Sequence, residues 1–188
     1  MIERTLVVIK PDGVFRGLNG KIIAVFEEAG LKIVGAKMVH ATKEMLEQHY
    51  VDDEEWKVAL GTKTVQGYKE KGLPIKETPI EIGNKIRNLL MSALARGPVF
   101  AMVLEGNDAI AQVRKITGAT APTKADPSTI RGRFTTDSYD FADAQKRIVN
   151  NLIHASEDKK TADREIRIWF KKNEIYDYKR CDESALFG

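Results

Sequence analysis

Cysteine is nearly absent from this chain, since Cys181 is the only one among its 188 residues. A lone cysteine cannot form an internal disulfide, and it fits a reducing compartment, with the cytoplasm as the default. No apolar run approaches the roughly 18–20 residues that span a bilayer, and the first ten residues lack the long apolar segment of a signal peptide. We therefore expect a soluble cytoplasmic protein with no membrane partner.

Neither sign of charge predominates, because the formal net charge is only +3. The chain therefore lacks the excess of basic residues that dedicated nucleic-acid-binding proteins have, although a local cluster could still hold a small anion. Several motifs are missing as well. There is no GxxxxGK[ST] loop, no cysteine–histidine cluster with zinc spacing and no aromatic RNP signature. These absences exclude a P-loop kinase, a zinc site of that type and an RNA-recognition sheet on their own signatures.

The pattern of apolar residues predicts one domain over residues 1–188, with strands and helices in alternation. Because strands and helices alternate, we expect one sheet with helices packed against it. We interpret two charged or irregular segments, 51–85 and 135–147, as insertions outside this core, called excursions below, and expect a turn or two of helix in the first. Residues 118–134 read as a loop. The expected strands are 4–9, 31–39, 99–104 and 148–153, and the expected helices are 19–29, 42–50, 84–95, 107–117 and 157–170.

Four residues could handle phosphate. Lys10 stands where the first buried strand ends, and a lysine on such a rigid mount can act as a point charge on a phosphate. Arg114 lies on an expected helix and Arg131 in the proline-rich loop, with Thr120 between them. Two planar guanidinium groups and a hydroxyl suit the spread charge of a transferring phosphoryl group. Taken singly, each of these cations is more typical of a solvated or ion-paired surface residue than of a phosphate site.

His154 has the most unusual context of the three histidines, because it follows an apolar strand and precedes a segment that could start a helix. A neutral imidazole can attack phosphorus without a separate base. The alternative is a core histidine whose hydrogen bonds are satisfied. Glu165 lies eleven residues further on and would be about 16 Å away if both residues shared one helix. The two side chains can meet only if His154 precedes the helix and the chain doubles back.

Several segments together resemble the nucleoside diphosphate kinase family. The matching segments cover about two-thirds of the chain and occur in the family's order. They are TLVVIKPDGV (5–14), the strand from Gly97-Pro98-Val99 to Leu104-Glu105-Gly106, VRKITGATAP (113–122), ADPSTIRGRF (125–134), NLIHASE (151–157) and ADREIRIWF (162–170).

The resemblance implies a ferredoxin-like α+β fold, in which helices cover an antiparallel sheet. It implies transfer of the terminal phosphate from a nucleoside triphosphate, mainly ATP, to a nucleoside diphosphate by a ping-pong mechanism. Mg²⁺ would be held by the nucleotide rather than by protein side chains, and the chain would form a homo-oligomer, a hexamer or a tetramer. Carried over by motif, His154 accepts the phosphoryl group, Glu165 holds its other ring nitrogen and Ser156 supports that pair. The implied nucleotide-binding residues are Lys10, Tyr50, Ile86, Leu90, Arg114, Thr120, Arg131, Ile148 and Asn151.

One departure from the family pattern concerns the nucleotide base. Ile86 stands where the family usually has a phenylalanine that stacks on the base, and an aliphatic side chain offers less stacking area. Our hypothesis is that Trp56 or Tyr68, from the 51–85 excursion, replaces that ring. An alternative function also stays open at this point, in which the chain is a non-catalytic relative that senses nucleotides or serves as a scaffold.

Overall fold

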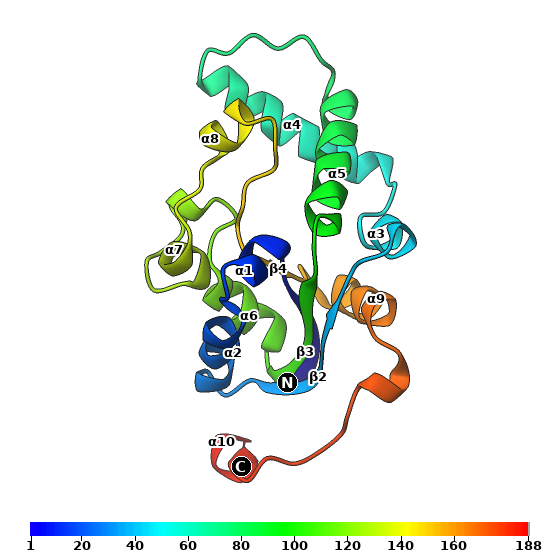
Figure 1. Ribbon diagram of the computed structural model, residues 1–188, viewed down its shortest axis with the longest axis vertical. Helices are drawn as coiled ribbons and strands as arrows, with labels where there is room; N and C mark the ends of the chain where they lie inside the picture. The colour runs from blue at the N-terminus through cyan, green and yellow to red at the C-terminus, as the bar shows by residue number, and fades with distance from the viewer. Residues whose placement is uncertain (188) are drawn as a thin grey trace.

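The computed structural model describes residues 1–187 of the chain, with side chains described as far as Ala185. A four-stranded antiparallel sheet in the order β2-β3-β1-β4 forms its centre (Figure 1). The strands are β1 (Ile2–Ile9), β2 (Lys32–Val39), β3 (Val99–Asn107) and β4 (Ile153–Ala155). With helices packed on it, this sheet confirms the expected α+β fold.

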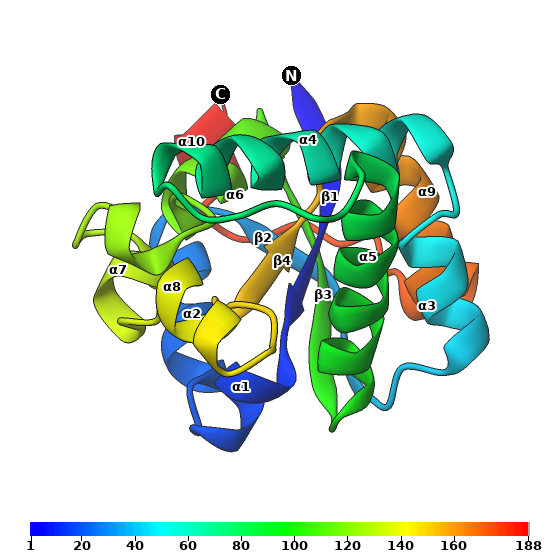
Figure 2. The ribbon, with the colours of Figure 1, turned by 90° about the horizontal axis from the view of Figure 1, so that it is seen from above.

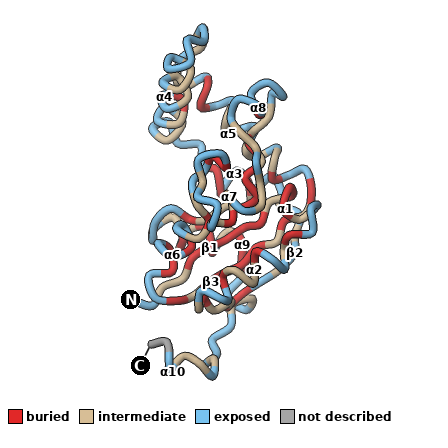
Figure 3. The backbone as a smooth tube through the Cα atoms, turned by 90° about the vertical axis from the view of Figure 1, so that its left-hand side faces the viewer, coloured by how far each residue is buried: buried red, intermediate tan, exposed pale blue. Residues whose placement is uncertain are grey.

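The alternation of side chains along β1 divides the core into two clusters, one on each face of the sheet. Val7 and Ile9 point into the first cluster, whereas Leu6 and Val8 point into the second. Buried residues accordingly follow the strands and the inner sides of the helices (Figure 3). The first face is covered by α2 (Asn19–Glu28) and α6 (Ala109–Thr117), and the second by α3 (Lys43–His49), α5 (Pro79–Ala95) and α9 (Lys159–Trp169) (Figure 2).

Shorter elements and one further long helix complete the described chain. These are α1 (Pro11–Phe15), α4 (Glu54–Glu70), η1 (Pro122–Lys124), α7 (Ile130–Phe134), α8 (Tyr139–Ala144), η2 (Lys172–Glu174) and α10 (Glu183–Phe187). The segment after η2 runs along β2, where the backbone N–H of Tyr176 donates to the carbonyl of Val34 at 2.8 Å. That segment therefore covers part of an edge strand that would otherwise expose unpaired backbone groups.

The prediction of only a turn or two of helix in 51–85 was wrong. This stretch contains the whole of α4, and α5 begins at Pro79 rather than at 84, with Thr78 as its N-cap in a capping box with Glu81. Helices α4 and α5 cross in direct backbone contact at Gly61 and Gly83. Because α4 is held by this contact, it does not need the broad apolar stripe that reveals most helices in a sequence.

The far end of α4 reaches α8, so the two segments read as separate excursions touch each other. Lys71 forms an ion pair with Asp140, and Asp143 lies beside Tyr68, whose pKa is raised by burial and by that carboxylate. Helix α4 thus extends across the upper side of the molecule toward α8 (Figures 1 and 2).

The expected strand 148–153 was also wrong, because regular pairing is confined to β4. Leu152 has a φ of +66°, which no residue of a β-strand adopts, and it interrupts the chain just before β4. The expected 118–134 loop contains a short helix, α7, and a further short helix, α1, begins at Pro11 directly after β1. No helix within residues 1–187 is long and apolar enough to cross a membrane.

The glycine contact between α4 and α5 gives a stability prediction. A Cβ added at Gly61 would lie 1.8 Å from the carbonyl oxygen of Pro79, and one added at Gly83 would lie 2.1 Å from that of Lys57. Gly61→Ala and Gly83→Ala are each expected to lower the free energy of unfolding by at least about 1–3 kcal/mol, the cost of overpacking. Denaturant and thermal unfolding measure the change.

Gly67→Ala is the matched control, because nothing lies within 4 Å of a Cβ at this position of the same helix. Alanine there should stabilise by up to about 1 kcal/mol through helix propensity. Equal effects of all three substitutions would contradict a backbone contact at the crossing.

Candidate active site

The register of β1 and β4 decides where His154 points. His154 lies opposite Val8, and directly opposed residues of an antiparallel pair share a face of the sheet. Val8 belongs to the second core cluster, so the imidazole faces the layer of α3, α5 and α9. Ser156, two residues further on, follows the same alternation and is completely buried.

Glu165, on α9, meets this imidazole. Its Oε2 lies 2.8 Å from Nε2 of His154 and accepts a hydrogen bond from Oγ of Ser156 at 2.6 Å. An ionised carboxylate can only accept, so in the neutral ring the proton lies on Nε2 and the lone pair lies on Nδ1. The chain doubles back between β4 and α9, which is the geometric condition that the sequence imposed on this contact.

The carboxylate of Glu165 is ionised although its side chain is only 3% exposed. Burial alone would raise its pKa, but the electrostatic interaction with His154, the hydrogen bond to His154 and the hydrogen bond from Ser156 lower the pKa to about 2. The negative charge of Glu165 therefore lies against the imidazole of His154, where it stabilises any positive charge that develops on the ring.

His49 completes this cluster, and no pattern in the sequence singled it out. Its ring lies edge-on to that of His154 with centroids 4.5 Å apart, and its Nδ1 accepts a hydrogen bond from Nε1 of Trp169 at 3.2 Å. Burial, followed by the nearby His154, lowers the pKa of His49 to about 3. His49 is therefore neutral and does not compete with His154 for the carboxylate's charge.

His49, His154 and Glu165 are also close enough together to hold a metal ion. Their hydrogen bonds favour a different use. Nε2 of His154 contacts Glu165, and Nδ1 of His49 is occupied by the indole N–H of Trp169, so an ion bound through these two nitrogens would displace both contacts.

A second group of residues gathers around Lys10, at the end of β1. Nζ of Lys10 donates to Oδ1 of Asn151 at 2.7 Å, and Nδ2 of Asn151 donates to the carbonyl of Thr120 at 3.0 Å. Burial, together with the nearby cations Arg131 and Arg96, lowers the pKa of Lys10 to about 8 against the opposing effect of Asp12. An incoming anion would stabilise this desolvated cation.

The two arginines singled out from the sequence differ in their surroundings. Arg131 donates to the carbonyls of Asn151, Gly118 and Ile153 at 3.2, 2.8 and 2.8 Å, so three of its five N–H groups fix the backbone around β4. Arg114 lies exposed in the last turn of α6. Arg131 thus holds the backbone around β4 in place, a role that the sequence did not suggest. Its two remaining N–H groups could donate to a ligand.

The backbone before His154 forms a strained turn. The N–H of Ile153 donates to the carbonyl of Asn151 at 2.8 Å, which closes a three-residue γ-turn on Leu152 at its positive φ. Such a conformation costs about 1–3 kcal/mol in a non-glycine residue. The buried carboxylate of Asp12 accepts from the N–H of Leu152 at 2.9 Å. Asp12 is a second residue that the sequence did not single out.

The remaining expected residues are Tyr50, Ile86, Leu90 and Ile148. Tyr50 is buried beside His49, with ring centroids 4.7 Å apart, and its carbonyl accepts from Nε of Arg87 on α5. This bond ties the end of α3 to the helix that carries Ile86 and Leu90 one turn apart. Both of these side chains are half-buried, as is Ile148 in the segment between α8 and β4.

The sequence profile of the nucleoside diphosphate kinase family matches residues 3–62 and 83–175, most of the chain. The chain belongs to the nucleoside diphosphate kinase family. The profile's one gap, 63–82, falls inside the 51–85 excursion and holds the end of α4 and the start of α5, and the match runs unbroken through 135–147. This kinase is 45% identical over 179 residues to the nucleoside diphosphate kinase of Pyrobaculum aerophilum, covering 93% of this chain and 98% of the relative.

Solved structures agree with this assignment. The NDP kinase structure from Pyrobaculum aerophilum has a TM-score of 0.91 at 43% identity and covers 94% of this chain and 100% of that one. The kinase from Borrelia burgdorferi, solved as a transition-state mimic with vanadate and ADP, has a TM-score of 0.81 at 36% identity, covering 99% and 97%. The kinase from Halobacterium salinarum, in complex with CDP, has a TM-score of 0.73 at 34% identity and covers both chains fully.

The lowered pKa of Lys10 predicts an alkaline limb in the pH profile. Lys10 is a cation below about pH 8 and loses its charge as the pH rises through that value. Since kcat/KM reports the ionisations of the free enzyme, it should fall with increasing pH from roughly pH 8 upward. Lys10→Arg should flatten this limb, because a guanidinium stays charged throughout.

Lys37→Arg is the control. Lys37 lies on β2 and forms an ion pair with Glu174, so this substitution should keep the wild-type pH profile. An unchanged alkaline limb in Lys10→Arg would assign the titration to another group.

Proposed function

We propose that this kinase transfers the terminal phosphate of a nucleoside triphosphate, mainly ATP, to a nucleoside diphosphate through a phosphohistidine at His154. The observation that carries the proposal is the contact between Nε2 of His154 and Glu165, which leaves the Nδ1 lone pair as the nucleophile. In the first half-reaction, the bond from Nδ1 to the γ-phosphorus forms as the bond from phosphorus to the bridging oxygen breaks. The diphosphate leaves, a second diphosphate enters, and the same bonds exchange in reverse.

Glu165 and Ser156 would serve the histidine through both half-reactions. A phosphorylated imidazole that keeps its Nε2 proton is positively charged, and the carboxylate of Glu165 lies against that proton. No proton has to leave the ring, so no separate base is needed. The hydroxyl of Ser156 holds the carboxylate in place at 2.6 Å.

The phosphates would lie against Lys10, Arg114, Arg131, Thr120 and Asn151. Phosphoryl transfer passes through a loose transition state whose charge is spread over oxygens, so positioned cations and donors provide most of the catalysis. These side chains are cations, hydroxyls and amides rather than carboxylates. They suit an Mg²⁺–nucleotide complex in which the metal is coordinated by the substrate's own phosphates and water.

The nucleotide base would lie between α5 and the segment that follows α8, against Ile86, Leu90 and Ile148. Relatives of this chain have been solved with ADP and with CDP, which supports a site that accepts both purine and pyrimidine bases. Of the two aromatic candidates for stacking, Trp56 packs against the second core cluster. Tyr68 instead lies at the far end of α4 beside α8, and we propose it as the stacking residue.

We also propose a homo-oligomer, a hexamer rather than a tetramer, which rests on the family resemblance. Exposed Phe15 and Met38, with 63% and 56% of their surface accessible, offer apolar area that a second copy could cover. The cytoplasm stays the predicted compartment.

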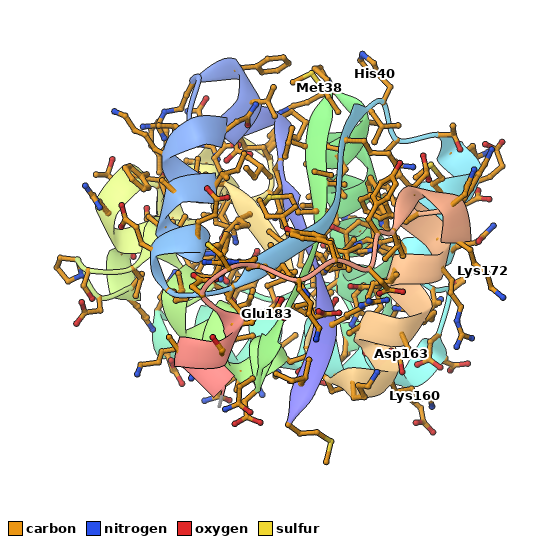
Figure 4. The ribbon with its side chains drawn as sticks, turned by 90° about the horizontal axis from the view of Figure 1, so that it is seen from below. Met38, His40, Lys160, Asp163, Lys172 and Glu183 are labelled. Carbon is orange, nitrogen blue, oxygen red and sulfur yellow. The ribbon has the colours of Figure 1, made fainter. Side chains whose placement is uncertain are left out.

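Labelling with γ-labelled ATP and Mg²⁺ tests the phosphohistidine. The wild type should acquire label that is acid-labile, base-stable and discharged by added GDP, whereas His154→Ala should acquire none. His40→Ala is the control, because His40 lies exposed at the outer edge of the molecule (Figure 4), and it should keep the label. A folded wild type that binds nucleotide without labelling would favour the sensor or scaffold alternative.

The proposed role of Tyr68 is tested separately. Tyr68→Ala should raise the KM for ADP by about fivefold, the loss of roughly 1 kcal/mol of stacking. Tyr176→Ala, at an exposed tyrosine beyond α9, should leave it unchanged. A nucleotide complex in which the ring of Tyr68 lies away from the base would contradict the assignment.

A further inference from the structure

The γ-turn at Leu152 connects the two halves of the proposed site. Its first residue is Asn151, whose side chain contacts Lys10, and His154 follows its last residue directly. A change in the turn would move the phosphate-binding amide and the nucleophile relative to each other. The geometry of phosphoryl transfer therefore depends on whatever holds this turn.

Two hydrogen bonds from the segment that follows β1 hold the turn. The carboxylate of Asp12 accepts from the N–H of Leu152 at 2.9 Å, and the N–H of Lys10 donates to the carbonyl of Leu152 at 2.8 Å. Both backbone groups of Leu152 are thus held, and Asp12 provides the only one of these contacts made by a polar side chain.

Asp12 could instead act by its charge alone. One of its oxygens lies 3.8 Å from a guanidinium nitrogen of Arg96, and its charge also acts on Lys10 and Arg131. The geometry favours the hydrogen bond, because the oxygen that faces Leu152 is within bonding distance, whereas the contact with Arg96 is longer than a hydrogen bond.

We propose that Asp12 is a positioning residue for phosphoryl transfer: its hydrogen bond to the backbone of Leu152 holds the γ-turn that sets Asn151 and His154 against the transferring phosphate. This inference rests on the proposed function of His154. Three substitutions separate its two possible contributions. Asp12→Ala removes both the hydrogen-bond acceptor and the charge. Asp12→Asn keeps the acceptor and removes the charge, whereas Asp12→Glu keeps the charge and displaces the acceptor by one methylene group.

Single-turnover labelling with γ-labelled ATP measures the rate of phosphohistidine formation and the ATP concentration at half-saturation. Asp12→Ala and Asp12→Glu should slow labelling by about tenfold to a hundredfold, the effect of a small misplacement, with half-saturation changed by less than about threefold. Asp12→Asn should recover most of the rate. A slow Asp12→Asn beside a fast Asp12→Glu, or a fast Asp12→Ala, would overturn the proposal.

Hydrogen exchange at the amide of Leu152 provides a readout that does not need activity. Protection of this amide should be lost in Asp12→Ala and Asp12→Glu and kept in Asp12→Asn, while the amides of β3 stay protected in all variants and show that each is folded. Protection that survives in Asp12→Ala would overturn the inference. A wild type that takes no label would refute the proposed function instead, and exchange would still decide whether Asp12 holds the turn.

Discussion

The contact between Glu165 and His154 is the interaction around which the second face of the molecule is arranged. A carboxylate this deeply buried is tolerated only when donors surround it. Here the donors are the imidazole and Ser156, both from the β4 segment, so the requirement of one charge fixes α9 against the sheet. Trp169, one turn further along α9, donates to Nδ1 of His49, whose ring is kept neutral chiefly by burial. The charge of Glu165 that fixes α9 against the sheet also occupies Nε2 of His154 and so leaves Nδ1 of His154 free.

Charges of opposite sign lie close to His154. The carboxylate of Glu165 contacts its ring, and Lys10 and Arg131 contact the residues just before it in the chain, where burial and neighbouring cations lower the pKa values of both side chains. Such a cluster is electrostatically unfavourable until an anion enters it. The overall charge of +3 conceals this arrangement, because net charge reports the sum over the surface and not the placement of a few buried groups.

Segments with an unbroken apolar run or a clear stripe were predictable from the sequence. The core of β1, the start of β3, helix α2 and helix α3 all lie where the local sequence pattern placed them. Helix α4 was not predictable, because its packing depends on Gly61 and Gly83, which meet the backbone of Pro79 and Lys57 only in the folded chain. His49 and Asp12 were missed for a similar reason, since their partners, Trp169 and Leu152, are more than a hundred residues away.

The γ-turn explains why β4 is so short and why a leucine occupies its strained position. Glycine at 152 would remove the backbone strain of about 1–3 kcal/mol. It would also delete a fully buried side chain from the first core cluster, and truncation of a buried leucine even to alanine costs about 2–5 kcal/mol. Because the lost packing would cost more than the strain, leucine is the more stabilising residue here. Its side chain fixes the turn in the core, while its backbone, held by Asp12 and Lys10, ends the irregular segment so that β4 begins in register with Val8 opposite His154.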